Sequence, residues 1–476
     1  MLKKDLASRI KKALGAKKVF QALEDRICYA YDASQRQSIP DLVVIPETVQ
    51  EVASVMQIAN KMAVPVVPRG AGSGMSGGSI PVCGGIVMAM THFQSILEID
   101  TDNLMTVVQP GVITSTLQEA VEEQGLFYPP DPASQSFSTI GGNIAENAGG
   151  MRAVKYGVTQ DYVQRLEVVL PNGRVVHTGS KCVKDVVGYN LTQLFVGCEG
   201  TLGIITEATL RLLPLPENQK TMSVTFPSIR EVGYCVSEII KRKIIPTTLE
   251  FLDHNAIWSV NQYLDLGVPQ GTGAFMLIEV DGPAEQVDKD IFRVAEICRE
   301  IGSLNIDIAE SQSERKRLWK ARRSVSASLA WHNPVKKINE DIVVPRASLP
   351  DMVESIEQIA DETGMLIVNF GHAGDGNIHV NVLVKEDTLA QAHVAVRRIF
   401  EKTVQLGGCI TGEHGVGISK QDFIDMNLEP SSLDLMRAIK NKLDPHGILN
   451  PGKIFPEDRR EPINSMDSNH NASSEK

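Results

Sequence analysis

Residues 370–384 constrain the fold of this chain more than any other stretch, because they join a strand pattern to two histidines. Apolar side chains recur at every second position over 378–384, and a period of two predicts a β-strand. The Gly-Asp-Gly turn before it lets the backbone fold tightly, so His372 on the loop can approach His379 at the start of the strand. We therefore expect a strand that begins at a pair of imidazoles.

A second cluster, Thr-Gly-Glu-His-Gly-Val-Gly at 411–417, supplies Glu413 and His414. Two imidazoles, a carboxylate and a further histidine could form a divalent metal site with a general base beside it. The alternative is a pair of glycine-rich turns whose histidines only hydrogen-bond locally. Because the chain contains two such clusters, we favour the metal site.

Composition excludes several classes of protein. At 476 residues the chain is too long for one ordinary core, so two or more domains are expected. The hydrophobic fraction of 42% and the charged fraction of 22% are typical of a soluble globular protein. A net charge of −11 argues against nucleic acid as the main partner. No stretch approaches the roughly 20 apolar residues of a membrane span.

The cysteines and the N-terminal residues indicate in which cellular compartment the protein is expected. The seven cysteines are scattered and form no C-x-x-C pair, which predicts reduced thiols in a cytoplasmic protein and no iron–sulfur cluster held by such motifs. Residues 1–20 are basic and carry apolar side chains every four residues, as in an amphipathic helix. This helix could serve targeting or surface binding. It lacks a secretory apolar core, so we prefer a structural first helix and leave peripheral contact with the inner membrane face open.

Glycine-rich stretches at 69–78, 138–150 and 197–206 predict a large ligand. Glycine allows backbone N–H groups to converge on a diphosphate, with Arg69 available as a counter-charge. The first loop matches neither the P-loop nor the Rossmann pattern, which argues against both folds. Each stretch alone could be a structural turn. Because glycines return after Gly407, four such stretches predict a cofactor in extended contact with the backbone.

The order of elements predicts an α+β protein with two main domains. Strand and helix patterns fill residues 1–216, with a hairpin at Pro-Asn-Gly (171–173), and prolines end this half. Residues 217–406 alternate strands and helices, which predicts an antiparallel sheet with helices on one face. Residues 407–456 are expected to return to the first domain. The polar tail, 457–476, is predicted to be disordered.

Several motifs together resemble the FAD-linked 2-hydroxy-acid dehydrogenases. They are Pro-Arg-Gly-Ala-Gly-Ser (68–73), Pro-Asp-Pro-Ala-Ser (130–134), Thr-Ile-Gly-Gly-Asn (139–143), Gly-Thr-Leu-Gly-Ile-Ile (200–205), Gly-His-Ala-Gly-Asp-Gly-Asn-Ile-His (371–379), Gly-Glu-His-Gly (412–415) and Leu-Asn-Pro-Gly-Lys (449–453). The resemblance covers about residues 25 to 456. It implies a vanillyl-alcohol-oxidase (PCMH-type) FAD fold with an α+β substrate, or cap, domain.

The resemblance also implies which residues hold FAD. The first loop would hold the pyrophosphate, through Arg69, Gly70, Ala71, Gly72 and Ser73. The ribityl chain and isoalloxazine would lie against Pro130, Asp131, Ser134, Thr139, Gly142 and Asn143. The adenine and diphosphate side would be bracketed by Gly200, Gly203 and Ile205, and Asn450 would return to the flavin. Because the first loop contains no histidine, we expect FAD to be bound non-covalently.

For catalysis, the resemblance implies that His372, His379 and Glu413 bind zinc or manganese, with His414 as the base. Arg322 matches the arginine that binds the substrate carboxylate, with Ser326 one turn later on the same helix face. The alternative for Arg322 is a solvated helix charge. Lys336 and Lys337 could add positive charge.

The implied reaction is FAD-dependent oxidation of a small 2-hydroxy acid, D-lactate or glycolate, to the 2-oxo acid. Electrons would pass to a separate acceptor: an electron-transferring flavoprotein, an iron–sulfur subunit or a quinone. Two alternatives stay open, a D-2-hydroxyglutarate dehydrogenase and an electron-transfer flavoprotein subunit of a larger complex.

Overall fold

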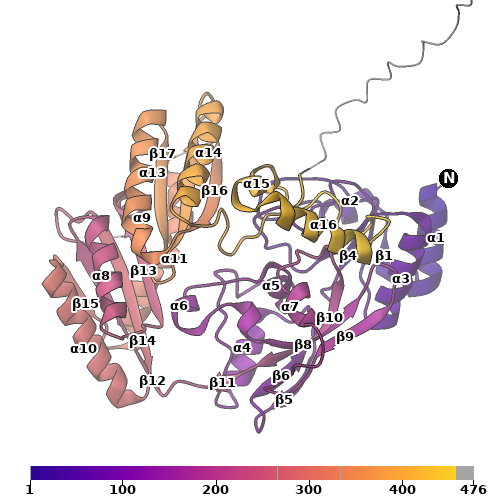
Figure 1. Cartoon of the computed structure of the whole chain (residues 1–476), viewed down its shortest axis with the longest axis horizontal. Helices are drawn as coiled ribbons and strands as arrows, with labels where there is room; N and C mark the ends of the chain where they lie inside the picture. The colour runs from indigo at the N-terminus through magenta and orange to yellow at the C-terminus, as the bar shows by residue number, and fades with distance from the viewer. Residues whose placement is uncertain (1, 265, 333, 457–476) are drawn as a thin grey trace, which may run out of the picture.

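A computed structural model describes residues 2–264, 266–332 and 334–456 (Figure 1). The predicted disordered tail, 457–476, lies outside the described residues. Among the described residues, no helix is both long and apolar enough to cross a bilayer.

A four-stranded sheet opens the chain, in the order β1 (Val19–Phe20), β2 (Leu42–Val44), β4 (Ile86–Ala89) and β3 (Val66–Arg69). Strand β4 runs parallel to both β2 and β3. Helices α1 (Leu2–Leu14) and α3 (Val49–Met62) pack on this sheet, and Ile10 and Met56 are fully buried in the shared core. The N-terminal helix is therefore part of the fold, as the apolar spacing predicts.

A five-stranded antiparallel sheet follows, in the order β5 (Ile96–Asp100), β6 (Met105–Val108), β10 (Ile204–Arg211), β8 (Val163–Val169) and β9 (Val175–Gly179). The hairpin predicted at 171–173 joins β8 to β9, and Gly173 adopts a φ of 80° in its turn. Side chains of α4 (Thr114–Glu122) and α5 (Ile140–Glu146) share a core with this sheet. A short pair, β7 (Leu126–Phe127) and β11 (Leu213–Pro214), lies where the first half ends.

The second half is built on one seven-stranded sheet that is antiparallel throughout. Its order is β15 (Asn305–Ile308), β12 (Asn218–Phe226), β14 (Ala274–Gly282), β13 (Thr248–Asp253), β17 (Leu366–His372), β18 (Asn377–Val384) and β16 (Lys336–Val343). The strand expected after the Gly-Asp-Gly turn is β18.

Helices cover both faces of this sheet, so the expectation of one covered face is wrong. The larger core includes α8 (Ile229–Lys241), α10 (Ala284–Ile301), α13 (Leu349–Thr363) and α14 (Leu389–Gln405). On the other face lie α9 (His254–Tyr263), α11 (Gln312–Arg323) and α12 (Val325–Ser328). Neighbouring residues of one strand join different cores, as Phe251 and Leu252 of β13 do, because successive strand side chains point to opposite faces.

The C-terminal segment lies beside the N-terminal half, where Figure 1 shows the yellow α16 (Pro430–Leu443) next to purple elements. The Asn450 N–H donates to the Val66 carbonyl at 2.8 Å, and the Ile418 N–H donates to the Ser76 carbonyl at 2.8 Å. These bonds join residues far apart in sequence. The domain limits at 216 and 406 stay a prediction, although β12 begins at Asn218.

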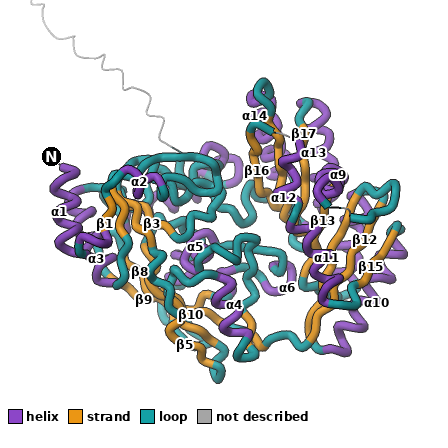
Figure 2. Tube along the Cα trace, turned by 180° about the vertical axis from the view of Figure 1, so that it is seen from behind, coloured by secondary structure: helices purple, strands orange, loops and turns teal. Residues whose placement is uncertain are grey.

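Short helices complete the regular structure: α2 (Leu23–Ile27), α6 (Ala153–Tyr156), α7 (Leu191–Phe195) and α15 (Ile424–Asn427). Figure 2 shows loops, in teal, gathered between the two sheet-bearing halves. Residues of the first glycine-rich loop, of α5, of the turn at 198–203 and of the loop at 411–417 line one groove, so the fold brings these segments together.

Candidate active site

Strand register brings four polar residues to one face of the seven-stranded sheet. Glu250 on β13 is paired directly with His372 on β17, and Asp341 on β16 is paired with His379 on β18. Each of these side chains is at least nine-tenths buried. Because β17 and β18 are joined by the tight turn at 373–376, His372 and His379 are neighbours, with ring centroids 5.1 Å apart. The predicted pair of imidazoles is present, but His372 is the last residue of β17 and does not lie on a loop, because β17 pairs with β18 up to His372 and Asn377.

Three predicted ligand atoms converge beside this pair. The Nε2 atoms of His372 and His379 lie 3.4 Å apart, and Oε1 of Glu413 lies 3.7 Å and 3.5 Å from them, respectively. Two ligand atoms bound tetrahedrally to zinc at 2.0–2.2 Å are roughly 3.3–3.6 Å apart. The three atoms therefore have the spacing of a metal coordination sphere, and the donor set suits a divalent ion.

The loop that carries Glu413 and His414 is wrapped around the carboxylate of Asp341. Oδ2 of Asp341 accepts the backbone N–H groups of residues 412, 413 and 414 at 2.8–2.9 Å. Oδ1 accepts an amide N–H of Asn377 at 2.6 Å. This curvature lets two consecutive side chains face one point, since Nε2 of His414 lies 3.9 Å from Oε1 of Glu413.

Asp341, His379, Glu413 and His414 also offer ligand atoms that all lie within 4.8 Å of one another. Asp341 is a poorer ligand than His372, because its oxygens already accept the loop N–H groups and Asn377. We therefore keep His372, His379 and Glu413 as the proposed ligands and assign Asp341 to holding the loop.

Burial and neighbouring charges determine the protonation states of the three proposed ligands and of Asp341. Burial lowers the pKa of His379 to about 3, so its ring is neutral and Nε2 can carry a lone pair. Burial alone would raise the pKa of Glu413, but the hydrogen bond and charge of His372 lower it to about 2. Burial also opposes the ionisation of Asp341, yet His414 and Lys420 hold its pKa well below the usual range. Burial lowers the pKa of His372, but Glu250 and Glu413 raise it well above the usual range, so this ring carries a proton on Nε2 that a bound metal ion would displace.

Arg322 reaches the cluster through Glu250, a residue that the sequence analysis missed. Nε of Arg322 donates to Oε2 of Glu250 at 2.6 Å, and the guanidinium carbon lies 4.8 Å from the ring centroid of Phe370. Arg322 is 8% exposed, so it is not a solvated helix charge. The signal for Glu250 was an acidic residue inside an apolar strand, which is buried only where it is paired. Asp341 lacked this signal, because the residues before it in β16, Asn339 and Glu340, are polar as well.

The helix predicted to continue from Arg322 to Ser326 is broken, so this expectation is wrong. Helix α11 ends at Arg323 and α12 starts at Val325. Ser326 instead accepts a hydrogen bond from Nζ of Lys337 at 2.9 Å, and Lys336 is exposed.

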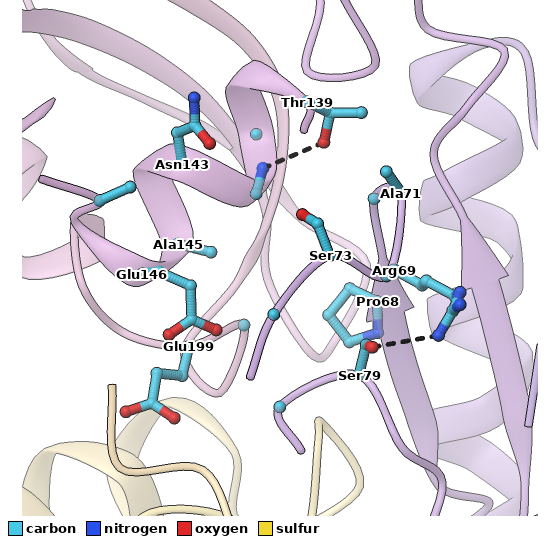
Figure 3. A pocket seen from close by; sticks show the side chains of 18 of the residues that line it. Pro68, Arg69, Ala71, Ser73, Ser79, Thr139, Asn143, Ala145, Glu146 and Glu199 are labelled. Atoms are coloured by element: carbon cyan, nitrogen blue, oxygen red, sulfur yellow. Dashed lines mark hydrogen bonds between the residues drawn. The ribbon is translucent and has the colours of Figure 1, made fainter. Parts of the chain in front are cut away.

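A groove in the N-terminal half ends at this cluster, because Glu413 and His414 line it. Most of the predicted cofactor residues line it as well: Arg69, Gly70, Ala71, Gly72, Ser73, Ser134, Thr139, Gly142, Asn143, Gly200, Gly203 and Ile205. Figure 3 shows Thr139 bonded to the start of α5, and Arg69 turned toward Ser79 at 3.1 Å. The cofactor groove and the histidine cluster are thus continuous.

The first glycine-rich loop fits a diphosphate. Within the described part of the chain, no backbone N–H of residues 70–79 donates a hydrogen bond to the protein. The loop approaches its neighbours closely, because a Cβ on Gly70 would lie 2.3 Å from Oγ1 of Thr139. A run of unused donors on the wall of a groove suits a ligand rich in acceptor oxygens.

Three predicted cofactor residues are buried behind the groove instead of lining it. Pro130 accepts a hydrogen bond from Gln118 at 2.9 Å. Asp131 accepts the Arg152 backbone N–H at 3.1 Å, and burial raises its pKa to about 6. Asn450 donates to the carbonyls of Gly78 and Glu199. Through the Pro130 carbonyl and the Asp131 and Asn450 side chains, these residues hold the groove's walls together.

The sequence analysis also missed two carboxyl groups on the groove wall, Glu146 and Glu199, which face each other in Figure 3. Glu199 accepts the backbone N–H groups of Val416 and Gly417 at 2.8 Å and 2.7 Å. Glu146 forms no hydrogen bond with the described residues, and burial beside Glu199 raises its pKa well above the usual range. Glu199 therefore ties the C-terminal loop to the groove.

Comparisons with known proteins agree with this description. Residues 40–179 match the family model described as FAD binding domain, and residues 215–454 match FAD linked oxidases, C-terminal domain. The chain is 45% identical to the glycolate oxidase subunit GlcD of Bacillus subtilis, over 97% of this chain and 99% of that protein. It is 35% identical to a D-lactate dehydrogenase of Anaerostipes hadrus, over 87% and 89%.

A solved structure of p-cresol methylhydroxylase has the same fold, with a TM-score of 0.80 at 18% identity, over 95% of this chain and 96% of that one. The predicted α+β class and the PCMH-type FAD fold are therefore confirmed, and the two family models support FAD as the cofactor.

Proposed function

The chain belongs to the family of FAD-linked oxidases, and on this premise we propose that it oxidises a small 2-hydroxy acid to the 2-oxo acid. We favour glycolate or D-lactate, because similar proteins bear the names of enzymes for these two acids. The proposal rests on one observation: three metal-ligand atoms and His414 converge where the cofactor groove ends.

When bound, FAD supplies a two-electron acceptor, and a zinc or manganese ion at His372, His379 and Glu413 supplies a Lewis acid for the substrate hydroxyl. His414 accepts the hydroxyl proton at Nε2, the nitrogen that faces Glu413. Its Nδ1 lies 3.9 Å from Asp341, whose negative charge stabilises the imidazolium that forms. Arg322 binds the substrate carboxylate through its Nη atoms, because its Nε is already held by Glu250.

Electrons leave to a separate acceptor: an electron-transferring flavoprotein, an iron–sulfur subunit or a quinone. We place the protein in the cytoplasm, where its seven unpaired cysteines would remain reduced.

Anaerobic bleaching of the flavin absorbance tests the proposal. We expect glycolate or D-lactate to bleach the purified flavoprotein, and L-lactate to serve as the stereochemical control. Bleaching by D-2-hydroxyglutarate alone would keep the reaction class and change the substrate. A flavin that no 2-hydroxy acid bleaches, but that a reduced partner protein does, would replace the proposal with the electron-transfer subunit.

A further inference from the structure

We infer that Glu250 is a positioning residue that aligns His372 and Arg322 as one unit. It would thereby couple the metal site to the group that binds the substrate carboxylate. This inference rests on the proposed function and adds to it, because Glu250 touches neither the groove nor the three ligand atoms directly.

The two oxygens of Glu250 are divided between these partners. Oε1 lies 2.5 Å from Nδ1 of His372, and Oε2 lies 2.6 Å from Nε of Arg322. The Glu250 side chain is fully buried. A buried carboxylate is stable only when it is paired and hydrogen-bonded. Loss of either partner would leave an uncompensated buried charge, so both contacts are strongly favoured. The three side chains therefore hold fixed positions relative to one another.

The hydrogen bond from His372 fixes its tautomer. A carboxylate can only accept, so Nδ1 carries the proton and donates it to Glu250. In the neutral ring, the lone pair then belongs to Nε2, the atom that lies 3.4 Å from His379 and 3.7 Å from Glu413. A carboxylate behind a ligating histidine orients the ring and raises its basicity, and its loss typically costs 10–100-fold in metal affinity.

The bond to Arg322 orients the other partner. Arg322 lies in the last turn of α11, and its guanidinium rests on the ring of Phe370. With Nε held by Glu250, rotation of the guanidinium is restricted and its remaining nitrogens keep one direction. Glu250 therefore determines where a substrate carboxylate binds relative to the metal ligand His372.

Glu279 provides a matched control on the neighbouring strand β14. It is 2% exposed and, like Glu250, is bonded to an arginine of α11, here Arg315 at 2.9 Å. Its other partners are Trp319 and Thr221, and no histidine is among its hydrogen-bond partners in the described chain. Glu279→Gln removes a buried carboxylate–arginine pair from the same sheet and helix without touching the proposed site.

The test compares zinc binding by wild type, Glu250→Gln and Glu279→Gln, by competition with a chromogenic chelator. We expect Glu250→Gln to weaken zinc binding 10–100-fold and Glu279→Gln to leave it unchanged. The KM for the 2-hydroxy acid should also rise in Glu250→Gln, because the amide cannot accept from both partners as the carboxylate does. Equal zinc affinity in all three proteins would overturn the inference.

A second measurement separates this inference from the proposed function. A histidine Nδ1–H bonded to a carboxylate gives a downfield proton resonance, which should be present in wild type and in Glu279→Gln and lost in Glu250→Gln. If wild type binds no zinc, the metal part of the proposed function fails. The resonance then tests the alignment of His372 independently of zinc. Its loss in Glu250→Gln would support the role of Glu250, and its persistence there would refute it.

Discussion

At the scale of single residues, His414 differs from its neighbours in the cluster because it is not one of the three proposed ligands. Its ring stacks on His379 with centroids 5.6 Å apart, and its Nε2 faces the same point as Glu413. We expect His414→Asn to keep both metal and FAD while flavin reduction slows by roughly 10²–10⁴-fold, as in the loss of a general base. High pH should restore part of the rate. Stopped-flow bleaching and metal analysis of one sample test this, and loss of metal would make His414 a ligand.

Glu340 should make the free energy of unfolding depend on pH, and the burial of its carboxyl group determines the sign of this dependence. Burial, aided by Asp341, raises its pKa to about 7 in the folded protein. The folded state then holds a proton that the unfolded chain has released. The stabilisation from the neutral carboxyl is complete below about pH 4 and is lost as the pH rises through about 7. Relative to wild type, Glu340→Gln should gain about 1–3 kcal/mol of unfolding free energy between pH 4.5 and pH 8. Urea denaturation of both proteins at pH 4.5 and pH 8 tests this. A difference in unfolding free energy between variant and wild type that is the same at both pH values would contradict it.

The residues of the site divide by what the sequence could reveal. His372, His379, Glu413 and His414 were predictable, because each stands in a short glycine-rich motif. The position of Glu250 inside an apolar strand signals a buried, paired carboxylate, but its partners were not predictable, because they depend on the pairing of β13 with β17, strands more than a hundred positions apart. Strand register between distant segments is set by the whole sheet and leaves no local pattern.

At the scale of elements, the turn between β17 and β18 determines how the two histidines meet. Gly376 has a φ of 84°, and a Cβ there would lie 2.0 Å from the backbone oxygen of Val344. Gly376→Ala should therefore destabilise the protein by about 2–4 kcal/mol, from left-handed strain plus the clash. Gly364→Ala is the control, with a φ of 67° and nothing within 4 Å of its Cβ, and should cost only about 1 kcal/mol. If urea denaturation shows equal losses of unfolding free energy in Gly376→Ala and Gly364→Ala, the backbone has moved to relieve the clash and the prediction is wrong.

Most elements were predictable from periodicity, whereas their layering was not. The amphipathic pattern of α8 or α10 shows that a helix covers a face, but not which one. Helices α9, α11 and α12 cover the opposite face, and α11 brings Arg322 to Glu250. The break at Ser324 separates Arg322 from Ser326 and had no glycine or proline to signal it.

At the scale of the whole molecule, the cluster of proposed metal ligands and the groove draw mainly on different halves of the chain. The histidines stand on the seven-stranded sheet, whereas the groove is lined mainly by loops of the N-terminal half. We expect His379→Ala to lose metal and nearly all turnover while keeping FAD, because its ring does not line the groove. Metal analysis and flavin absorbance of the purified variant test this. Loss of FAD together with the metal would show that the two sites form one cooperative unit.

The groove also determines how FAD is retained. Its walls come from the first glycine-rich loop, from α5 and from the turn at 198–205, and Asn450 of the C-terminal segment holds these walls together from behind. Among the described residues, His414 is the only histidine that lines the groove, and it faces the metal cluster. We therefore expect the affinity for FAD to come from many weak contacts, chief among them those of the unused N–H groups of residues 70–79, and these contacts are lost when the chain unfolds. We therefore expect acid or heat to release FAD into the supernatant, where its absorbance and fluorescence identify it. A covalent flavoprotein treated in parallel is the control.

Flavin that remains with the precipitated protein would mean a covalent bond. Cys198 on the groove wall would then be the first residue to test, by substitution to serine.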